Sequence, residues 1–189
     1  MLFSEFKESS ASKKSLDKPS LTENEIIGVA AGVFLAGFDT LSAITSSALY
    51  ELALHEQIQE RLFQELSANL DSLDPNSEEY IEVAMKLPYL DCVIKETLRK
   101  YPVLARLERR VNVENYSLGE QQKIPLVKDQ VVEISTIALH YNEQLHPEPF
   151  RFNPDRFSAE NKHLLLPYSL LPFGDGPRNF KLLISCLSS

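Results

Sequence analysis

The stretch TENEIIGVAAGVFLAGFDTLSAITSSALYELALH, residues 22–55, is the longest regular pattern in the sequence and determines the class of the fold. Thr22 and Glu25 fit a capping box, in which the threonine hydroxyl accepts from the N3 amide and the glutamate reaches back to the cap amide. No obvious stop signal follows until about His55. The sequence therefore predicts one helix of some thirty residues, about 50 Å long at about 1.5 Å per residue.

This helix is apolar on nearly every side. From Ile26 to Leu54 its only charged residues are Asp39 and Glu51, and helices of that kind lie inside large folds. The uninterrupted apolar run, Ile26–Phe38, has 13 residues, a length more typical of a core helix than of a membrane span. We therefore expect a core helix, and we expect much of the fold that would surround it to be absent from the chain.

Two further helices are expected. Glu56–Leu70 places three apolar residues at helical spacing with polar residues between them: Ile58, Leu62 and Leu66. The acidic, turn-rich stretch DSLDPNSEEY, residues 71–80, then leads to a helix over residues 87–101 that Pro102 ends. Its predicted buried stripe consists of Leu90, Ile94, Leu98 and Tyr101.

Beyond Val111 the pattern changes to short extended segments. Val113 and Tyr116, KIP at 123–125 and QVVEIS at 130–135 predict strands around a hairpin. Val132 and Ile134 share one face of the last strand. From His146 onward, prolines at short intervals exclude long regular structure. The sequence thus predicts a mainly α fold with a small β sheet, preceded by a flexible polar lead-in over residues 1–20.

Composition and charge exclude several classes of function. The formal net charge is -8, and no dense basic stretch offers a nucleic-acid footprint. The first residues mix charges with serines and lack the apolar run of a signal peptide. Cys92 and Cys186 match no disulfide framework and no zinc-ligand spacing, which indicates a reducing compartment. We expect no nucleic-acid partner, no bound zinc and no targeting or membrane-spanning segment.

Within the long helix, AGFDT at residues 36–40 has two interpretations. Small residues at Ala36 and Gly37 would let a flat ligand lie against the backbone, with Asp39 and Thr40 supplying a proton carrier and a hydroxyl. Alternatively, the small residues mark a helix–helix crossing, Asp39 faces solvent and Thr40 bonds back to its own helix. Because small residues are common at crossings, the five residues alone favour the second interpretation.

The motif KETLRKYP, residues 95–102, contains Glu96 and Arg99. An opposite-charge pair three apart on a helix contributes about 0.2–0.5 kcal/mol when exposed. Both residues lie away from the predicted apolar stripe, so the spacing alone favours a solvated ion pair. Later in the chain, RFNPDRF at 151–157 is compatible with a plain turn in which Pro154 fixes φ and Asp155 caps.

The glycine-rich PFGDGPRNF, residues 172–180, is no P-loop, because no Lys-Ser/Thr pair follows the glycines. It is either a tight surface turn or a loop that lies close to a flat cofactor. In the second case Arg178 would offer its guanidinium to a carboxylate.

The order of these four motifs is more specific than any one of them. AGFDT, then ExxR as Glu96 and Arg99, then PDRF at 154–157, then FGDGPRN at 173–179 resembles the C-terminal part of cytochrome P450, the haem-thiolate monooxygenases. RLERR at 106–110, together with the PRN of the loop, most resembles the animal microsomal branch that oxidises drugs and other foreign compounds.

The resemblance implies an incomplete domain. It runs from about Thr22 to Asn179 and covers well under half of a complete family member. We therefore expect residues 21–179 to form a partial cytochrome P450 domain and residues 180–189 an unrelated tail. Intact relatives lie at the endoplasmic reticulum membrane, use an NADPH-dependent reductase and act on lipophilic small molecules, whereas the family's membrane anchor would lie in a part that is not present.

The resemblance also implies roles for individual residues. Asp39 and Thr40 match the pair that delivers protons during dioxygen cleavage. Glu96, Arg99 and Arg156 match a buried scaffold triad, which replaces the solvated pair as our expectation. The implied haem-binding positions are Arg109, Phe173, Gly174, Gly176 and Arg178, and the implied substrate-contact positions are Phe34, Leu35, Ala36, Val103, Leu104 and Ala105.

One position departs from the family. Two residues after the loop arginine the family has the cysteine whose thiolate ligates the haem iron, and here that position is Phe180. A phenyl ring has no lone pair to donate, and Cys186 is six residues further on. We therefore expect no metal ligand in the loop and no monooxygenase activity of the chain as given.

Two other interpretations stay open. The chain could be a non-catalytic interaction module that pairs with an intact relative or with its reductase, since large exposed apolar faces mark partners or aggregation. The tail after Asn179 could instead come from unspliced or frame-shifted message, because the similarity ends abruptly there.

Overall fold

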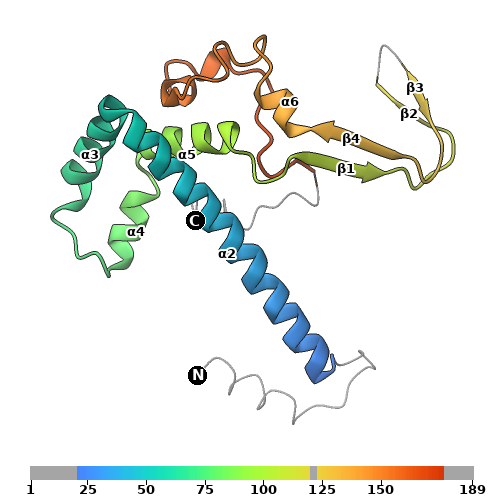
Figure 1. The fold of residues 1–189 in the computed structure, drawn as a ribbon, viewed down its shortest axis with the longest axis horizontal. Helices are drawn as coiled ribbons and strands as arrows, with labels where there is room; N and C mark the ends of the chain where they lie inside the picture. Colours follow the sequence, from blue (N-terminus) through green and yellow to red (C-terminus); the bar gives the residue numbers. More distant parts are fainter. Residues whose placement is uncertain (1–20, 120–122, 177–189) are drawn as a thin grey trace. The chain divides into compact units, whose positions relative to one another are not determined.

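A computed structural model describes residues 21–119 and 123–176 of the chain (Figure 1). The contacts divide the chain between Asp39 and Thr40 into two units. Residues 21–39 of the first unit contain the N-terminal part of helix α2, and the second unit contains the other described elements. The architecture is mainly helical with small antiparallel sheets, as the sequence predicts.

Helix α2, Glu23–Leu54, confirms the predicted long helix and its capping box. The Glu25 amide donates to the Thr22 hydroxyl oxygen over 3.3 Å, and the Thr22 amide donates to Glu25 Oε2 over 2.7 Å. The Thr22 hydroxyl also donates to Glu25 Oε2 over 2.8 Å, and the bonds from the Thr22 amide and hydroxyl lower the pKa of the Glu25 carboxyl. The cap therefore satisfies amides that the first turn of a helix leaves without an intrahelical partner.

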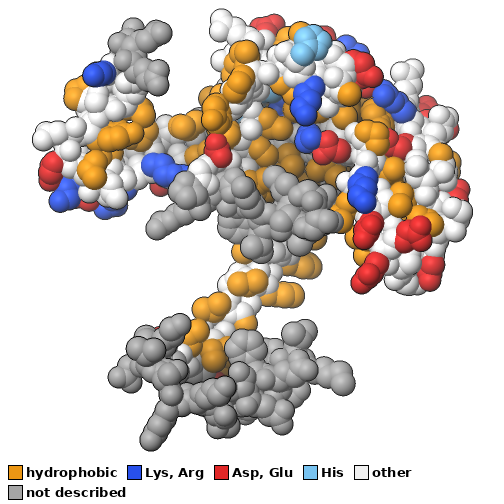
Figure 2. Space-filling model, turned by 180° about the vertical axis from the view of Figure 1, so that it is seen from behind, with side chains coloured by type: hydrophobic (Ala, Val, Ile, Leu, Met, Phe, Trp, Pro, Cys, Tyr) orange, Lys and Arg blue, Asp and Glu red, His pale blue; other side chains and the backbone are white. Residues whose placement is uncertain are grey.

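The expected burial of α2 is not observed, because Glu51 is the only buried residue of the helix. In its N-terminal part, which belongs to the first unit, the large apolar side chains are exposed, and Figure 2 shows orange side chains along the helix. They are Ile26, Ile27, Val29, Val33, Phe34, Leu35 and Phe38. By length and composition, α2 is also able to cross a membrane. Core helices of soluble proteins meet the same criterion.

The described residues of the second unit contain four further α-helices: α3 Glu56–Leu70, α4 Glu78–Ala84, α5 Pro88–Lys100 and α6 Thr136–His140. The predicted bounds of α3 and α5 are confirmed to within one residue. Helix α4 lies where a connection was predicted. Its signal is local, because the Ser77 hydroxyl accepts from the Tyr80 amide over 3.1 Å and two glutamates follow the cap.

The core lies between α3, α5 and the segment that follows α6. The buried face of α5 differs from the predicted stripe, since Leu90 and Ile94 are only partly buried. Two charged residues of α5, Glu96 and Arg99, are buried as well. The buried face therefore differs from the one that the apolar stripe predicts. The buried core cluster consists of Leu62, Tyr89, Cys92, Val93, Phe152 and Phe157.

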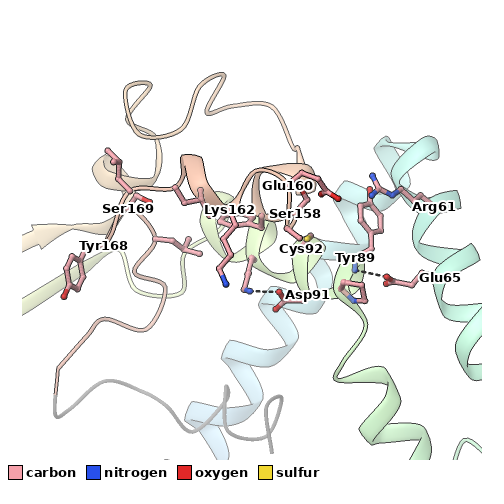
Figure 3. A pocket seen from close by; sticks show the side chains of 17 residues that line it. Arg61, Glu65, Tyr89, Asp91, Cys92, Ser158, Glu160, Lys162, Tyr168 and Ser169 are labelled. Carbon is pink, nitrogen blue, oxygen red and sulfur yellow. Dashed lines mark hydrogen bonds and ion pairs between the residues drawn. The ribbon is translucent and has the colours of Figure 1, made fainter.

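Helix α5 begins against α3. Glu65 of α3 accepts from the Tyr89 amide over 2.8 Å and from the Leu90 amide over 2.9 Å, and Figure 3 shows the first of these bonds. A carboxylate at a helix N-terminus satisfies free amides and interacts favourably with the helix dipole. One side chain of α3 therefore fixes where α5 starts.

Four strands form two antiparallel pairs. Strand β1, Arg106–Arg110, pairs with β4, Val131–Ser135, and β2, Tyr116–Leu118, pairs with β3, Ile124–Leu126. The predicted hairpin and last strand are confirmed. Strand β1 was not predicted, because its sequence RLERR is charged. The strand pairs with β4, and Leu107 lies opposite Ile134.

The remaining described chain has only short helical turns. They are the 3₁₀ helices η1, Pro154–Phe157, and η2, Lys162–Leu164. The η1 cap is the Asn153 side chain, which accepts from the Asp155 amide over 3.2 Å, rather than Asp155 itself. Asp155 instead binds Arg61 of α3, with 2.7 Å between Oδ1 and Nη1.

We expect Phe152→Ala to lower the free energy of unfolding by about 3–5 kcal/mol, because it leaves a cavity in the core. Phe152 is 2% exposed. Phe150, two residues earlier, is 75% exposed, so Phe150→Ala serves as the matched control and should cost no more than about 1 kcal/mol. Urea denaturation of the two variants measures the difference. Equal losses would mean that Phe152 is not a core residue.

Candidate functional site

A charge network is buried in the second unit. Arg99 Nε donates to Glu96 Oε2 over 2.7 Å, and Arg99 Nη2 donates to Glu96 Oε1 over 2.9 Å. Both side chains are 0% exposed. The solvated pair favoured by the spacing alone is therefore wrong, and the bond is a bidentate pair in the interior.

The other donors of Arg99 bind main-chain oxygens. Nη1 donates to the carbonyl of His140 over 2.8 Å, and Nη2 also donates to the carbonyl of Pro149 over 2.8 Å. A buried guanidinium requires partners for its donors. Arg99 thus connects α5 with the end of α6 and with the chain 50 residues downstream.

Arg156 joins the same network from η1. Its Nε lies 3.4 Å from Glu96 Oε1, which also accepts from the Asn153 amide over 2.9 Å. Arg156 Nη2 donates to the Glu148 carbonyl over 2.7 Å. Burial lowers the pKa of Arg156, and the Glu96 carboxylate opposes that shift. The structure therefore brings together the three residues that sequence analysis grouped, with Glu96 at the centre.

The glycine loop is described as far as Gly176. Gly174 and Gly176 have φ angles of +75° and +92°, in the region that favours glycine. A Cβ atom at Gly174 would lie 3.3 Å from Leu107 Cδ2 of β1. Phe173 is half-buried beside these glycines. The loop therefore packs closely on β1.

Arg109 contacts the loop from β1. Its Nη2 donates to the Asp175 carbonyl over 3.1 Å, and its Nη1 donates to the Glu108 carbonyl over 2.8 Å. Arg109 is exposed. The assignment of Arg109 to a haem carboxylate stays a prediction. Arg178 and Phe180 lie outside the described residues, as does Cys186.

The implied substrate-contact residues fall in two places. Phe34, Leu35 and Ala36 are exposed on α2 in the first unit, where the Phe34 and Phe38 rings stack with centroids 6.0 Å apart. In the second unit Val103 is half-buried, and Leu104 and Ala105 are exposed.

Thr136, which sequence analysis did not identify, holds the segment after α5. Its hydroxyl donates to the Leu104 carbonyl, and its amide donates to the Ala105 carbonyl over 3.1 Å. Thr136 is 0% exposed. The start of α6 therefore positions the chain between α5 and β1.

Asp39 and Thr40 stand at the division between the units. They are consecutive residues of α2, Asp39 is exposed and Thr40 is half-buried. Their proposed role in proton delivery is not tested by this arrangement and stays a prediction.

A second buried acid was also missed. Glu51 of α2 is 1% exposed, its Oε1 lies 2.7 Å from Lys100 Nζ, and the same oxygen accepts from the Tyr101 hydroxyl. Burial and the bond to Glu51 raise the pKa of Tyr101. Glu51 was visible in the sequence as one of two charges in an apolar helix, and that was its only signal. The contact attaches the C-terminal end of α2 to the end of α5.

A pocket of about 680 Å³ lies elsewhere (Figure 3). Residues of α3, α5 and the chain around η2 line it, among them Arg61, Cys92 and Tyr168. Among the described residues, none of the predicted site residues lines it. Burial raises the pKa of the Cys92 thiol, which opposes formation of a reactive thiolate. The network and the glycine loop, rather than this pocket, are therefore the candidate site.

The comparisons with known proteins identify the class. The family model "Cytochrome P450" matches residues 3–179, which begins earlier than Thr22, where the motifs alone started the similarity. The chain is 40% identical to rat Cytochrome P450 3A2 over 168 residues, 89% of this chain and 32% of that protein. It is also 40% identical to Probable cytochrome P450 6v1 of Drosophila melanogaster over 169 residues, 86% of this chain and 32% of that protein.

Both relatives are animal proteins whose names place them among the cytochromes P450. The chain belongs to the cytochrome P450 family. It spans about a third of the length of the curated relatives it matches.

We expect Glu96→Gln to lower the free energy of unfolding by about 3–5 kcal/mol, because it leaves the Arg99 charge buried and uncompensated. The matched control is Arg151→Gln. That residue forms an ion pair with Glu148 in which both side chains are about two-thirds exposed, so its loss should change stability by about 0.5 kcal/mol or less. Chemical denaturation at neutral pH checks both values. A Glu96→Gln variant as stable as the control would rule out a structural role for the network charge.

Proposed function

We propose that the chain carries the scaffold network and the haem-facing loop of a monooxygenase but does not catalyse the reaction of its family. That reaction inserts one oxygen atom from O2 into a lipophilic small molecule, with electrons from an NADPH-dependent reductase. The observation that supports loss of activity is Phe180, which stands where the iron-ligating cysteine is expected. A phenyl ring cannot supply the electron density that a thiolate gives to iron.

Two features of the described residues support a loop that faces haem. Positive φ angles at Gly174 and Gly176 let the backbone lie close to a flat group, and a Cβ at Gly176 would meet nothing within 4 Å among the described residues. They do not supply the iron ligand, because that position follows Gly176 by four residues and is Phe180. We therefore propose a loop that retains the shape for the cofactor without its bond to the metal.

The remaining roles follow from the same proposal. Asp39 and Thr40 would serve proton delivery in an active relative. The segments 34–36 and 103–105 would contact a lipophilic substrate, in keeping with their apolar side chains. The similarity to animal microsomal relatives implies the endoplasmic reticulum membrane as the location of intact members.

Spectroscopy of the haem-reconstituted, reduced chain with carbon monoxide tests the proposal. We expect the chain with Phe180 to lack the Soret band of thiolate-ligated haem, because no sulfur stands at the ligand position. The Phe180→Cys variant is the matched comparison, since it restores the family residue at that single position.

Cys186 provides the control for ligation from elsewhere. A thiolate-type band in the unmodified chain would contradict the proposal, and its disappearance in Cys186→Ser would assign the ligand to Cys186. A band that appears only in Phe180→Cys would support the proposal directly.

A second candidate function is a non-catalytic interaction module. The observation that favours it is the set of exposed apolar side chains on α2, including Val33 at 65% and Phe34 at 68% exposure. The partner would be an intact relative or its reductase.

For the interaction module, we expect sedimentation velocity of the chain mixed with the reductase or an intact relative to show a hetero-complex of defined size. Phe34→Glu with Phe38→Glu should weaken that complex by at least about tenfold, because it places charge on the apolar face. Self-aggregation without a defined complex would contradict this function and leave the proposal above unaffected.

A further inference from the structure

Two histidine side chains are buried beside the candidate site. His140 is the last residue of α6 and is 0% exposed, and His146 is 1% exposed. Their rings meet edge to face, with centroids 6.5 Å apart. Both rings form hydrogen bonds with the segment that leads into the glycine loop.

The bonds of His140 define its protonation. Its Nδ1 lies 3.1 Å from the Arg99 carbonyl oxygen, and its Nε2 lies 2.9 Å from the Leu171 amide nitrogen. A carbonyl can only accept and an amide N–H can only donate. The neutral tautomer with hydrogen on Nδ1 alone satisfies both bonds, so the imidazole bridges α5 and Leu171 as an uncharged group.

His146 holds the same segment two residues earlier. Its Nε2 lies 3.0 Å from the Ser169 carbonyl oxygen, so Nε2 carries the hydrogen. Its Nδ1 is buried with no hydrogen-bond partner among the described residues. A proton on Nδ1 would create a buried, unpaired donor, which is costly. The neutral form is therefore favoured here as well.

The segment that the histidines hold leads directly into the glycine loop. The Gly174 amide donates to the Leu171 carbonyl over 3.4 Å. The His140 carbonyl also accepts from the Arg99 guanidinium. A continuous series of bonds thus runs from the charge network through the His140 ring to Leu171 and on to Gly174.

We propose that His140 and His146 are positioning residues that, as neutral imidazoles, fix Ser169–Leu171 and thereby the entry to the glycine loop. The inference deepens the proposed function, since it rests on the loop being the haem-facing element. The bond pattern itself is independent of haem, because each group in it belongs to the protein.

Burial and the nearest basic groups favour the neutral rings. Burial lowers the pKa of His140 to about 4, with smaller contributions from His146 and Arg99, and the bond to the Arg99 carbonyl opposes this shift. Burial also lowers the pKa of His146. Arg99 and Arg156 act on His146 in the same direction, whereas the bond to the Ser169 carbonyl and the Glu96 carboxylate oppose it.

The direction of the pH effect follows. An unfolded histidine takes up a proton near its ordinary pKa of about 6.5, whereas folded His140 resists until about pH 4. The stabilisation is complete above the unfolded pKa and is lost as the pH falls through this window. A protonated ring would place N–H against the Leu171 N–H and break that bond.

Amide hydrogen exchange of the full chain, followed by NMR, tests the proposal. His140→Asn keeps a donor near the Arg99 carbonyl and removes the acceptor for Leu171, whereas His140→Gln keeps an oxygen that can accept from Leu171. We expect Leu171 protection to fall about tenfold or more in His140→Asn, the effect of losing one hydrogen bond. In His140→Gln it should stay within about threefold of the original. The exposed His163→Asn should leave it unchanged.

The unmodified chain gives a second test that needs no variant. Ring nitrogen shifts should show hydrogen on Nδ1 alone in His140 and on Nε2 alone in His146 at neutral pH, and Leu171 protection should fall as the pH approaches 4. A charged ring, the opposite tautomer of either histidine, or equal protection in His140→Asn and His140→Gln would overturn the proposal. Failure of haem to bind with this exchange pattern intact would count against the proposed function alone.

Discussion

The buried pair of Glu96 and Arg99 is the constraint on which the second unit depends. Two opposite charges without solvent contact are tolerated only when their remaining donors and acceptors are bonded. Arg99 therefore draws the carbonyls of His140 and Pro149 to α5, and Glu96 draws in the Asn153 amide and Arg156. The hydrogen bonds of these two side chains therefore hold together segments more than 40 residues apart in sequence.

Among the described residues after α6, prolines at short intervals leave only short helical turns, and individual side-chain contacts define the path of the chain. A helix or a sheet satisfies its own backbone, whereas the chain after His146 relies on side chains for part of that role. Phe152 and Phe157 supply the apolar contacts of this segment with α3 and α5. Arg156 binds the Glu148 carbonyl, and His146 binds the Ser169 carbonyl. The irregular path is thus defined by individual contacts rather than by repeating ones.

How much of this was available from the sequence depends on the kind of signal. Periodicity and caps gave α2, α3 and α5, because those signals are local. The prediction of which face of α5 is buried was wrong, because an apolar stripe does not indicate that Glu96 and Arg99 also face inward. Strand β1 was missed because RLERR has the composition of an exposed segment and is a strand only through its partner. Motif order grouped Glu96, Arg99 and Arg156, although their burial came from the resemblance and not from spacing.

Thr136, His140 and His146 had no such signal. Each side chain forms a hydrogen bond with a main-chain group far along the chain. Because main-chain groups are nearly the same at every residue, no sequence pattern predicts which residue is the partner. Such bonds also bear on the proposed absence of an iron ligand at Phe180. The bonds that hold the described part of the loop, from His140 to Leu171 and from Arg109 to Asp175, join protein groups only. A change at Phe180 removes none of them. Under the proposed function, a chain without the cysteine would keep these two bonds while lacking a bond to iron, because neither bond involves residue 180.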